Sequence, residues 1–462
     1  MDSVSLSQIC DAVGGALIQG DPATTVNHVS TDTRTLAPGS LFIALAGERF
    51  DGHAFLGQAV AAGANAVMVH TPADVPESAA CIRVEDTLKG LKALAAWSRR
   101  RYDIPLIAVT GSTGKTSTKD MIAAMLGARY NTHKNTGNFN NEIGLSHTLL
   151  ALEETHEASV VEMGMNHAGE ISVLSRMARP DAAVITNIGL SHIGNLGSQE
   201  NILAAKLEIL EGMAPDAPLI INGEDALLIG AAREMDRPVV RCGFSEGHDV
   251  RATDVGMSEA GSVFTAVTAD ASCQIRLNAP GRHSIQNCLC ALGAVLSVGL
   301  TLEQAAKGIA TLTAANMRLT VETTDFGTKI VNDAYNASPD SVAAALAVLM
   351  EMDARRRYAV LGDMLEMGEY AKEAHYETGK KAAKSGIDGL VAIGELSRHT
   401  AQGAKDAGMD GAKVYHCMEQ NDAVTYLRAS LGPGDAVLVK GSRGMRLERI
   451  VDVLVSTGQE EA

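Results

Sequence analysis

The clearest chemical feature of the sequence is a candidate phosphate-binding loop. The apolar run at residues 106–109 predicts a buried strand, which leads into Gly-Ser-Thr-Gly-Lys-Thr at residues 111–116, and helical sequence follows from about 116 to 126. A strand, a glycine loop and a helix in this order are the context in which such a loop binds phosphate.

The residue types fit contact with a polyphosphate. Gly111 and Gly114 let the backbone approach closely, and free amides at the helix N-terminus point at the anion. Lys115 would reach the β- and γ-phosphates, and the Thr116 hydroxyl would hold Mg²⁺. Val109 stands where the usual eight-residue pattern has a glycine, so this is a short variant, Gly-x-x-Gly-Lys-Thr. An ordinary strand-to-helix turn is the less favoured alternative.

Further polar residues follow other predicted strands. Glu162 follows the strand at 159–161, and His192 lies in the loop after the strand at 182–186. In parallel sheets the ligand site lies at the carboxyl ends of the strands, and a carboxylate there is a natural Mg²⁺ ligand. Taken alone, Glu162 could equally be a surface carboxylate, and His192 an ordinary loop histidine.

Two segments allow both a structural and a functional interpretation. Residues 198–212 predict one helix with Gly212 as its C-cap, and Lys206 near its middle would ordinarily be a surface lysine. Residues 134–144 are rich in Asn and Gly, which suits backbone turns but also contact with a polar ligand.

The elements that must position these residues alternate between strand and helix, which predicts an α/β fold of three domains. Residues 1–101 would form a small α/β domain, 102–315 a central phosphate-loop domain with a parallel sheet (strands at 106–109, 159–161, 182–186 and 219–221), and 316–462 a Rossmann-like doubly wound domain. In the last domain Ser338 predicts a helix N-cap followed by Pro339. It lacks Gly-x-Gly-x-x-Gly, so no dinucleotide site is predicted.

Composition excludes several classes of protein. The 462 residues carry a net charge of −16, which argues against a nucleic-acid or anionic-membrane surface. No apolar run reaches 18 residues, so we expect no membrane span. Seven scattered cysteines without a Cys-x-x-Cys pair support neither a zinc site nor a disulfide framework, and a reducing cytoplasm fits best.

Taken together, the motifs resemble the Mur ligase family of peptidoglycan biosynthesis over essentially the whole chain. The resemblance rests on Ser-Thr-Asp-Thr-Arg34, Gly-Glu-Arg-Phe-Asp-Gly-His53, the phosphate loop, Asn-Thr-Gly-Asn-Phe-Asn-Asn-Glu-Ile-Gly144, Glu-Met-Gly164, Asn-Ile-Gly-Leu-Ser-His192, Ala-Lys-Leu-Glu-Ile209, Asp-Ala-Tyr-Asn336 and Leu-Gly-Asp-Met-Leu-Glu-Met-Gly368. Two departures are Ser338, where the family usually has Asn, and Ser146, where Pro is frequent.

The resemblance implies a reaction and its participants. ATP would phosphorylate the terminal carboxylate of UDP-N-acetylmuramoyl-tripeptide, and the amine of D-alanyl-D-alanine would attack the acyl phosphate. Charge neutralisation between the two anions is the main task. Lys115 and two Mg²⁺ ions would supply it, with Thr116 and Glu162 on one ion and His192 and Lys206 on the other. The family's lysine at position 206 is carbamylated by CO₂, which turns it into an anionic metal ligand.

The resemblance also implies the binding residues. ATP would contact Gly111, Ser112, Thr113, Gly114, Lys115, Thr116, Ser117, Asn287, Arg318, Asp333, Tyr335 and Asn336. The muramoyl substrate would contact Ser30, Asp32, Arg34, Arg49, His53, Asn138, Asn140 and Asn141, while Lys440 or Arg443 could meet the dipeptide carboxylate. For the first five of these, turn chemistry and solvated charges are the simpler interpretation of the pattern alone. The family is usually monomeric, and ATP must meet the third domain across a cleft, which implies domain closure.

Two other functions stay open at this point. A sister amide ligase that adds another amino acid would share the nucleotide machinery. A phosphate-loop switch or regulatory ATPase would bind or slowly hydrolyse nucleotide without regard to muramoyl peptide.

Overall fold

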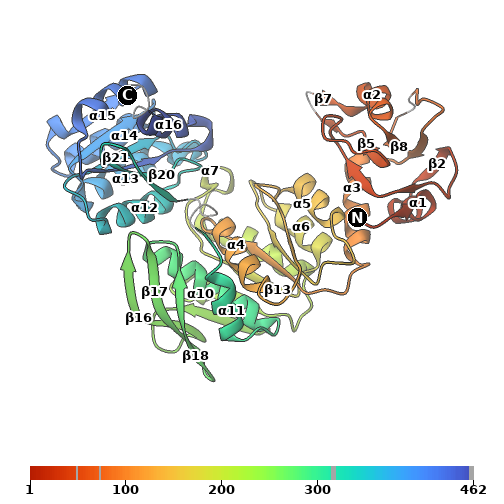
Figure 1. Ribbon diagram of the computed structural model, residues 1–462, viewed down its shortest axis with the longest axis horizontal. Helices are drawn as coiled ribbons and strands as arrows, with labels where there is room; N and C mark the ends of the chain where they lie inside the picture. Colours follow the sequence, from red (N-terminus) through yellow and green to blue (C-terminus); the bar gives the residue numbers. More distant parts are fainter. Residues whose placement is uncertain (48–49, 72–73, 314–318, 457–462) are drawn as a thin grey trace.

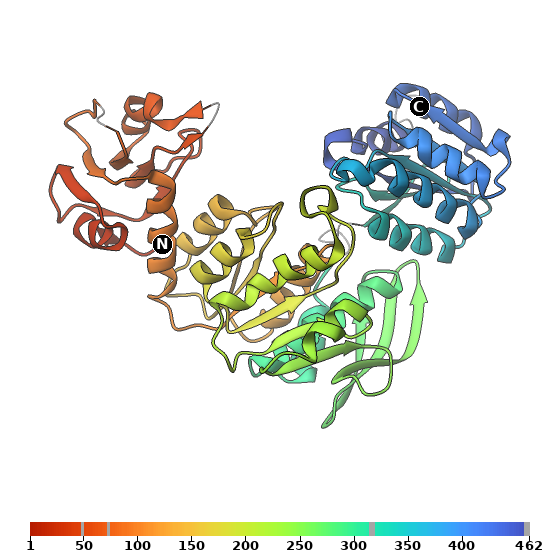
Figure 2. The same ribbon diagram turned by 180° about the vertical axis from the view of Figure 1, so that it is seen from behind.

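The computed structural model describes residues 1–47, 50–71, 74–313 and 319–456 of the 462-residue chain. Figures 1 and 2 show three lobes, with the first and last at opposite ends of the central one. The lobes follow the order of the predicted domains, whose boundaries at 101/102 and 315/316 stay predictions; the second boundary falls outside the described residues. Within the described ranges, no helix is long and apolar enough to cross a membrane.

The first lobe holds a five-stranded sheet in the order β2-β9-β8-β5-β4, in which only β2 runs antiparallel to its neighbour. Its strands are β2 (Ala16–Gln19), β4 (His28–Ser30), β5 (Ser40–Ile43), β8 (Ala64–Val69) and β9 (Ala80–Arg83). Helix α3 (Thr87–Arg99) begins after Asp86, whose carboxylate accepts the first free amides of the helix. This helix packs along α5 (Glu142–Leu150) and so joins the first lobe to the second.

The central lobe is built on a nine-stranded sheet in the order β11-β12-β10-β13-β14-β15-β16-β17-β18. The strands are β10 (Leu106–Thr110), β11 (Thr132–Lys134), β12 (Ala158–Glu162), β13 (Ala182–Ile185), β14 (Leu219–Asn222), β15 (Val239–Gly243), β16 (Val250–Ser258), β17 (Gly261–Val267) and β18 (Ser272–Leu277). Pairing is parallel from β11 through β16, which confirms the predicted parallel sheet of β10, β12, β13 and β14. The sequence prediction missed β11 and β15, and also the antiparallel extension formed by β16, β17 and β18.

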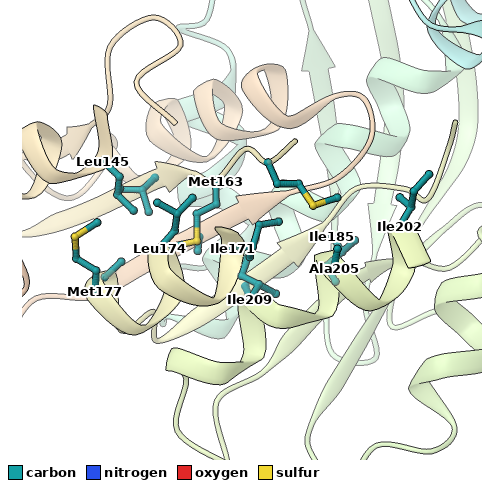
Figure 3. Packing of buried hydrophobic residues seen from close by; sticks show 14 of the residues in the cluster. Leu145, Met163, Ile171, Leu174, Met177, Ile185, Ile202, Ala205 and Ile209 are labelled. Atoms are coloured by element: carbon teal, nitrogen blue, oxygen red, sulfur yellow. The ribbon is translucent and has the colours of Figure 1, made fainter. Parts of the chain in front are cut away.

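Helices cover both faces of this sheet, which explains why its inner strands are continuously apolar. Ile107 and Val109 pack towards α4 (Lys115–Leu126) and α10 (Arg282–Ser297), while Ala108 packs on the opposite side. Figure 3 shows that opposite side, where side chains from α5, α6 (Glu170–Ala178) and α8 (Gln199–Leu207) meet the sheet.

The predicted helix at 198–212 is wrong in its second half. The α-helix ends at Leu207, and residues Glu208–Gly212 form a 3₁₀ segment. Gly212 is therefore not a left-handed C-cap. A Cβ on Gly212 would collide with the Ser175 carbonyl of α6, so close packing of two segments, rather than helix capping, requires the glycine here.

The third lobe is doubly wound, as predicted, around a six-stranded sheet in the order β19-β20-β24-β21-β22-β23. The strands are β19 (Thr320–Thr323), β20 (Lys329–Asp333), β21 (Arg357–Gly362), β22 (Gly389–Ile393), β23 (Val414–Cys417) and β24 (Ala436–Lys440), and only β19 is antiparallel. Helices α12 (Pro339–Glu351), α13 (Ala371–Ser385) and α14 (Ser397–Asp406), with α15 (Gln420–Ser430) and α16 (Glu448–Ser456), cover its faces. Ser338 caps α12 and Pro339 is its first residue, which confirms that prediction.

Candidate functional site

A cleft of about 510 Å³ lies between the carboxyl ends of the central strands and the third lobe. Both lobes contribute to its lining, so residues far apart in the sequence meet there. Of the predicted nucleotide and catalytic residues, the cleft brings together Ser112, Thr113, Gly114, Lys115, Thr116, Ser117, Glu162, Asn287, Asp333, Tyr335 and Asn336. Gly111, His192 and Lys206 are not part of this lining.

The phosphate loop has the predicted conformation. Gly111 and Gly114 adopt φ values of 147° and 78°, a region that side chains disfavour. A Cβ on Gly114 would lie 2.6 Å from the Asn287 Oδ1, and one on Gly111 would collide with the Thr186 hydroxyl. Helix α4 begins directly at Lys115, whose Nζ donates to the Gly111 carbonyl at 2.8 Å. Glycine is therefore required at both positions by conformation and by space.

Glu162 ends β12, next to the end of β10, and is only 1% exposed. Its two carboxylate oxygens accept hydrogen bonds from the Thr116 hydroxyl at 2.7 Å and from the Asn140 amide at 2.8 Å. A carboxylate beside a hydroxyl is a hard oxygen donor pair of the kind that Mg²⁺ prefers, so these residues fit the ion. No group of three or more His, Cys, Asp and Glu in the described ranges could hold a metal by itself, so phosphate oxygens and water would have to complete the coordination.

Asn135 holds the Asn-rich loop against Glu162, a role that the sequence analysis missed. It is 1% exposed, its Oδ1 accepts the Glu162 backbone N–H at 3.0 Å, and its Nδ2 donates to the Phe139 carbonyl at 3.0 Å. From α4, the buried Lys119 ammonium donates to the Asn135 carbonyl at 3.2 Å. The loop composition pointed to a polar role, but not to which amide is buried.

The three loop amides that were predicted to face substrate differ from one another. Asn140 bonds Glu162, and Asn141 caps α5 by accepting the Gly144 N–H at 2.9 Å. Asn138 is exposed. Asn138 is thus available to a ligand, whereas Asn140 and Asn141 already use one polar atom to hold the local structure.

His192 and Lys206 lie on separate turns, and neither lines the cleft. His192 precedes the short helix α7 (Ile193–Leu196) with a φ of 64°, which costs a non-glycine residue about 1 kcal/mol. Its Nδ1 lies 3.1 Å from the Glu366 Oε2 of the third lobe. Among the described residues, Glu366 is the partner that the sequence analysis did not assign.

Lys206 lies in the last turn of α8 and is 1% exposed. In the described part of the chain it has no hydrogen-bond or ion-pair partner, although the neighbouring Ala205 and Ile209 belong to the apolar core (Figure 3). Burial, and then the charge of Lys115, lowers the pKa of the Lys206 amine well below its usual value. The expectation of an ordinary surface lysine is therefore wrong.

On the other wall of the cleft, Asp333 and Lys440 pair in register at the ends of β20 and β24. The Lys440 Nζ donates to the Asp333 Oδ2 at 2.5 Å and to the Asn336 carbonyl at 2.8 Å, and the lysine is 2% exposed. Lys440 is thus held by Asp333 and not exposed for a dipeptide. His283 of α10 faces this pair, and its burial lowers the pKa of the ring.

Arg443, the other candidate for the dipeptide carboxylate, lies next to Tyr335, which lines the cleft. Its side chain is 65% exposed, with the guanidinium 5.7 Å from the Tyr335 ring centroid and bonded to Glu448 at 2.9 Å. Arg443 therefore keeps donors accessible to a ligand. The predicted residues Arg318 and Arg49 lie outside the described residues.

The predicted substrate residues of the first lobe that the structure describes lie away from the nucleotide cleft. Arg34 bonds Asp32 at 2.6 Å and lowers the pKa of that carboxyl to about 2, while Ser30 accepts the Asp32 N–H at 3.1 Å. His53 pairs with Asp51 at 2.6 Å. None of the predicted first-lobe residues that the structure describes lines the nucleotide cleft, so a substrate that contacts both would have to be long.

Comparisons with known proteins identify the family. Three models of Mur ligase domains match the chain: the Mur ligase family catalytic domain at residues 25–102, the Mur ligase middle domain at 109–295 and the Mur ligase glutamate ligase domain at 317–443.

Full-length relatives carry one name. The chain is 42% identical over 98% of both chains to the UDP-N-acetylmuramoyl-tripeptide–D-alanyl-D-alanine ligase of Bacillus subtilis, and 36% identical to that of Escherichia coli over 99% of this chain and all of that one. A crystal structure of MurF from Acinetobacter baumannii superposes with a TM-score of 0.91 at 31% identity, covering 98% of this chain and 99% of that one. MurF from Thermotoga maritima in complex with ADP gives a TM-score of 0.83 at 26% identity over 94% and 98% of the two chains. This chain therefore belongs to the Mur ligase family and has its three-domain fold.

Proposed function

We propose that this chain is an ATP-dependent ligase that joins D-alanyl-D-alanine to UDP-N-acetylmuramoyl-tripeptide. The observation that carries the proposal is the cleft in which the phosphate loop of the central lobe faces Asp333, Tyr335 and Asn336 of the third lobe. A nucleotide in such a cleft contacts both lobes, and the relatives of matching length bear the name of this reaction.

The chain's residues would divide the chemistry as follows. The loop amides and Lys115 hold the phosphates of ATP, and the γ-phosphoryl group passes to the tripeptide carboxylate, which releases ADP and forms an acyl phosphate. The amine of the dipeptide then attacks the acyl carbon, loses a proton and expels phosphate. Mg²⁺, held by Glu162 and Thr116 through their oxygens, would supply further positive charge between the two anions.

Lys206 and His192 would serve a second Mg²⁺ ion. Burial without a partner in the described structure lowers the pKa of the Lys206 amine and so favours its neutral form, which is the form that reacts with CO₂. The reaction forms an N–C bond, releases a proton and leaves a carbamate whose single negative charge is shared by two oxygens. This change converts a side chain that would repel a cation into one that binds it.

The remaining assignments follow from the resemblance to the family. The uridine diphosphate end would contact Ser30, Asp32 and Arg34, and the substrate would also contact Arg49 and His53. Asn138, Asn140 and Asn141 would face the muramoyl or peptide part, Asn287 the adenine, and Arg318 the phosphates. Arg443 would meet the dipeptide carboxylate. We expect a monomer acting in the cytoplasm, where ATP is available, with the lobes divided at residues 101/102 and 315/316.

The test is phosphate release from ATP in the presence of Mg²⁺, with the tripeptide nucleotide and the dipeptide supplied separately and together. We expect turnover only with both substrates. Turnover with a single amino acid in place of the dipeptide would identify a sister ligase. Turnover indifferent to both substrates would contradict the ligase function and favour a regulatory ATPase.

A further inference from the structure

The third lobe forms hydrogen bonds with both ends of the turn that carries His192. On one side of this turn, the Leu190 N–H donates to the Asp340 Oδ2 of α12 at 3.0 Å. On the other side, the Tyr370 hydroxyl donates to the Gly197 carbonyl at 2.6 Å. Both bonds join the central lobe to the third lobe, so the turn is fixed at both ends by a partner outside its own lobe.

Between these two bonds the backbones touch. Helix α7 packs on the 3₁₀ turn η4 (Gly368–Tyr370), and both views show α7 at the edge of the central lobe that faces the third lobe (Figures 1 and 2). A Cβ on Gly194 would lie 2.6 Å from the Gly368 nitrogen, and one on Gly368 would lie 2.7 Å from the Gly194 Cα. Two glycines therefore permit a contact that any side chain would push apart.

This contact brings a carboxylate of the third lobe to the ring of His192. The Nδ1 of His192 is buried and has no aligned hydrogen bond in the described structure, and the Glu366 Oε2 lies 3.1 Å from it. The Glu366 side chain is 56% exposed, so it reaches the ring from the solvent side of the interface. A small rotation of either group aligns an Nδ1–H···O bond at this distance.

We propose that Glu366 is a positioning residue that acts on His192 across the lobe interface. Its carboxylate accepts the Nδ1–H of the ring, which fixes the tautomer and leaves the Nε2 lone pair for a ligand. The inference rests on the proposed function, in which His192 serves a Mg²⁺ ion. It adds that the third lobe, and not the central lobe alone, completes this part of the site.

The arrangement makes His192 depend on lobe docking. The ring stands on a residue with a φ of 64°, and the bonds from Asp340 and Tyr370 hold that turn only while the third lobe is in place. When the third lobe moves away, Glu366 leaves with it. His192 then loses both its orientation and its tautomer preference, so the site is complete only when the lobe that carries the remaining contacts has closed.

The first test needs neither substrate nor metal. Histidine ring ¹⁵N–¹H NMR spectra of the metal-free protein, with His192 assigned from a His192→Asn variant, report which nitrogen carries the proton. We expect the Nδ1–H form in the wild type, its loss in Glu366→Ala and its retention in Glu366→Gln, which keeps an acceptor oxygen. His53 beside Asp51 is an internal reference that should not change, and Glu369→Ala is the matched control three residues away. An unchanged His192 tautomer in Glu366→Ala would overturn the proposal, whether or not the ligase activity is confirmed.

The second test uses kinetics. We expect Glu366→Ala to raise the Mg²⁺ concentration for half-maximal rate and to lower kcat by about tenfold or more, with the KM for the dipeptide unchanged. Glu366→Gln should recover most of the loss, and Glu369→Ala should behave as wild type. A rise confined to the dipeptide KM would mean that Glu366 contacts the incoming amine directly, and the positioning role would be wrong.

Discussion

Two buried lysines, one in each of the two lobes that bound the nucleotide cleft, differ in what surrounds them. Lys440 of the third lobe is 2% exposed and bonded to Asp333, whereas Lys206 of the central lobe is 1% exposed and has no partner among the described residues. A buried charge is stable only when it is paired: Asp333 compensates the charge of Lys440, whereas burial without a partner lowers the pKa of Lys206. Equal burial thus produces a structural cation in one lobe and a chemically reactive group in the other.

The largest expected effect of a substitution is at Lys206. Replacing Lys206 with Ala should lower the rate of ligation about a thousandfold, because a metal contact contributes several kcal/mol to such a reaction. Added short carboxylates should restore part of the activity by occupying the space of the carbamate. The measurement is phosphate release with both substrates, and full activity of Lys206→Ala without added carboxylate would show that no carbamate is needed. ¹³CO₂ labelling of the wild type would give an independent signal for the carbamate.

The pair of Lys440 with Asp333 should contribute to the free energy of unfolding. Asp333→Ala leaves the Lys440 ammonium buried without its carboxylate and should lower the free energy of unfolding by about 3 kcal/mol. The double variant Asp333→Ala, Lys440→Met should recover much of this loss, since no unpaired charge remains. Urea unfolding followed by far-UV circular dichroism measures the free energy of unfolding of both variants. A double variant as unstable as Asp333→Ala would show that the loss comes from packing rather than charge.

Replacing the unpartnered lysine should have the opposite sign. In CO₂-free buffer at pH 7, Lys206→Met should raise the free energy of unfolding by about 1–2 kcal/mol, because it removes a buried polar group without a hydrogen bond. Lys440→Met at the same pH should lower it, since it leaves Asp333 without its partner. Equal effects of the two substitutions would remove the distinction between the lysines.

The difference in stability between the wild type and Lys206→Met should also depend on pH, in a direction that the pKa shift determines. The pKa of Lys206 is lowered in the folded state from the ordinary 10.5, so between the folded pKa and 10.5 the unfolded chain binds more protons than the folded one. The stability that wild type loses for this reason returns as pH rises from the folded pKa towards 10.5, by at most about 1.4 kcal/mol per pH unit. The advantage of Lys206→Met should therefore shrink with rising pH in CO₂-free buffer, and a constant advantage would contradict the lowered pKa.

The smallest expected effect concerns the helix beneath the Lys440 side of the cleft. Ser338 caps α12 through its hydroxyl, so Ser338→Ala should lower the free energy of unfolding by about 1 kcal/mol. Ser338→Asn should change it by less than about 0.5 kcal/mol, because asparagine is an equally good cap. Thermal denaturation of the two variants measures the difference. A clear change in the KM for ATP with an unchanged stability in Ser338→Asn would mean that this position contacts the ligand.

Much of the fold was predictable because the signals are local. The strands β10, β12, β13 and β14, the helix α4 and the cap of α12 each follow from apolar runs and capping residues that are contiguous in the chain. The antiparallel strands β16 to β18 were missed because their alternating burial on a single face gives only a weak apolar signal. The helix at 198–212 was overextended since the tight approach of Gly212 to Ser175 is a tertiary contact.

The sequence by itself determined the phosphate loop, since Gly111, Gly114, Lys115 and Thr116 act within one strand–loop–helix unit whose geometry local spacing dictates. It also determined the family, because the motifs occur in order over the whole chain. Only the tertiary structure decided the partners. Whether a buried lysine has a carboxylate and which asparagine holds Glu162 depend on elements far apart in the chain, and which acid reaches His192 depends on the contact between two lobes. The charge and orientation of these groups follow from desolvation and from contacts across the sheet and the lobe interface, and no local pattern encodes either.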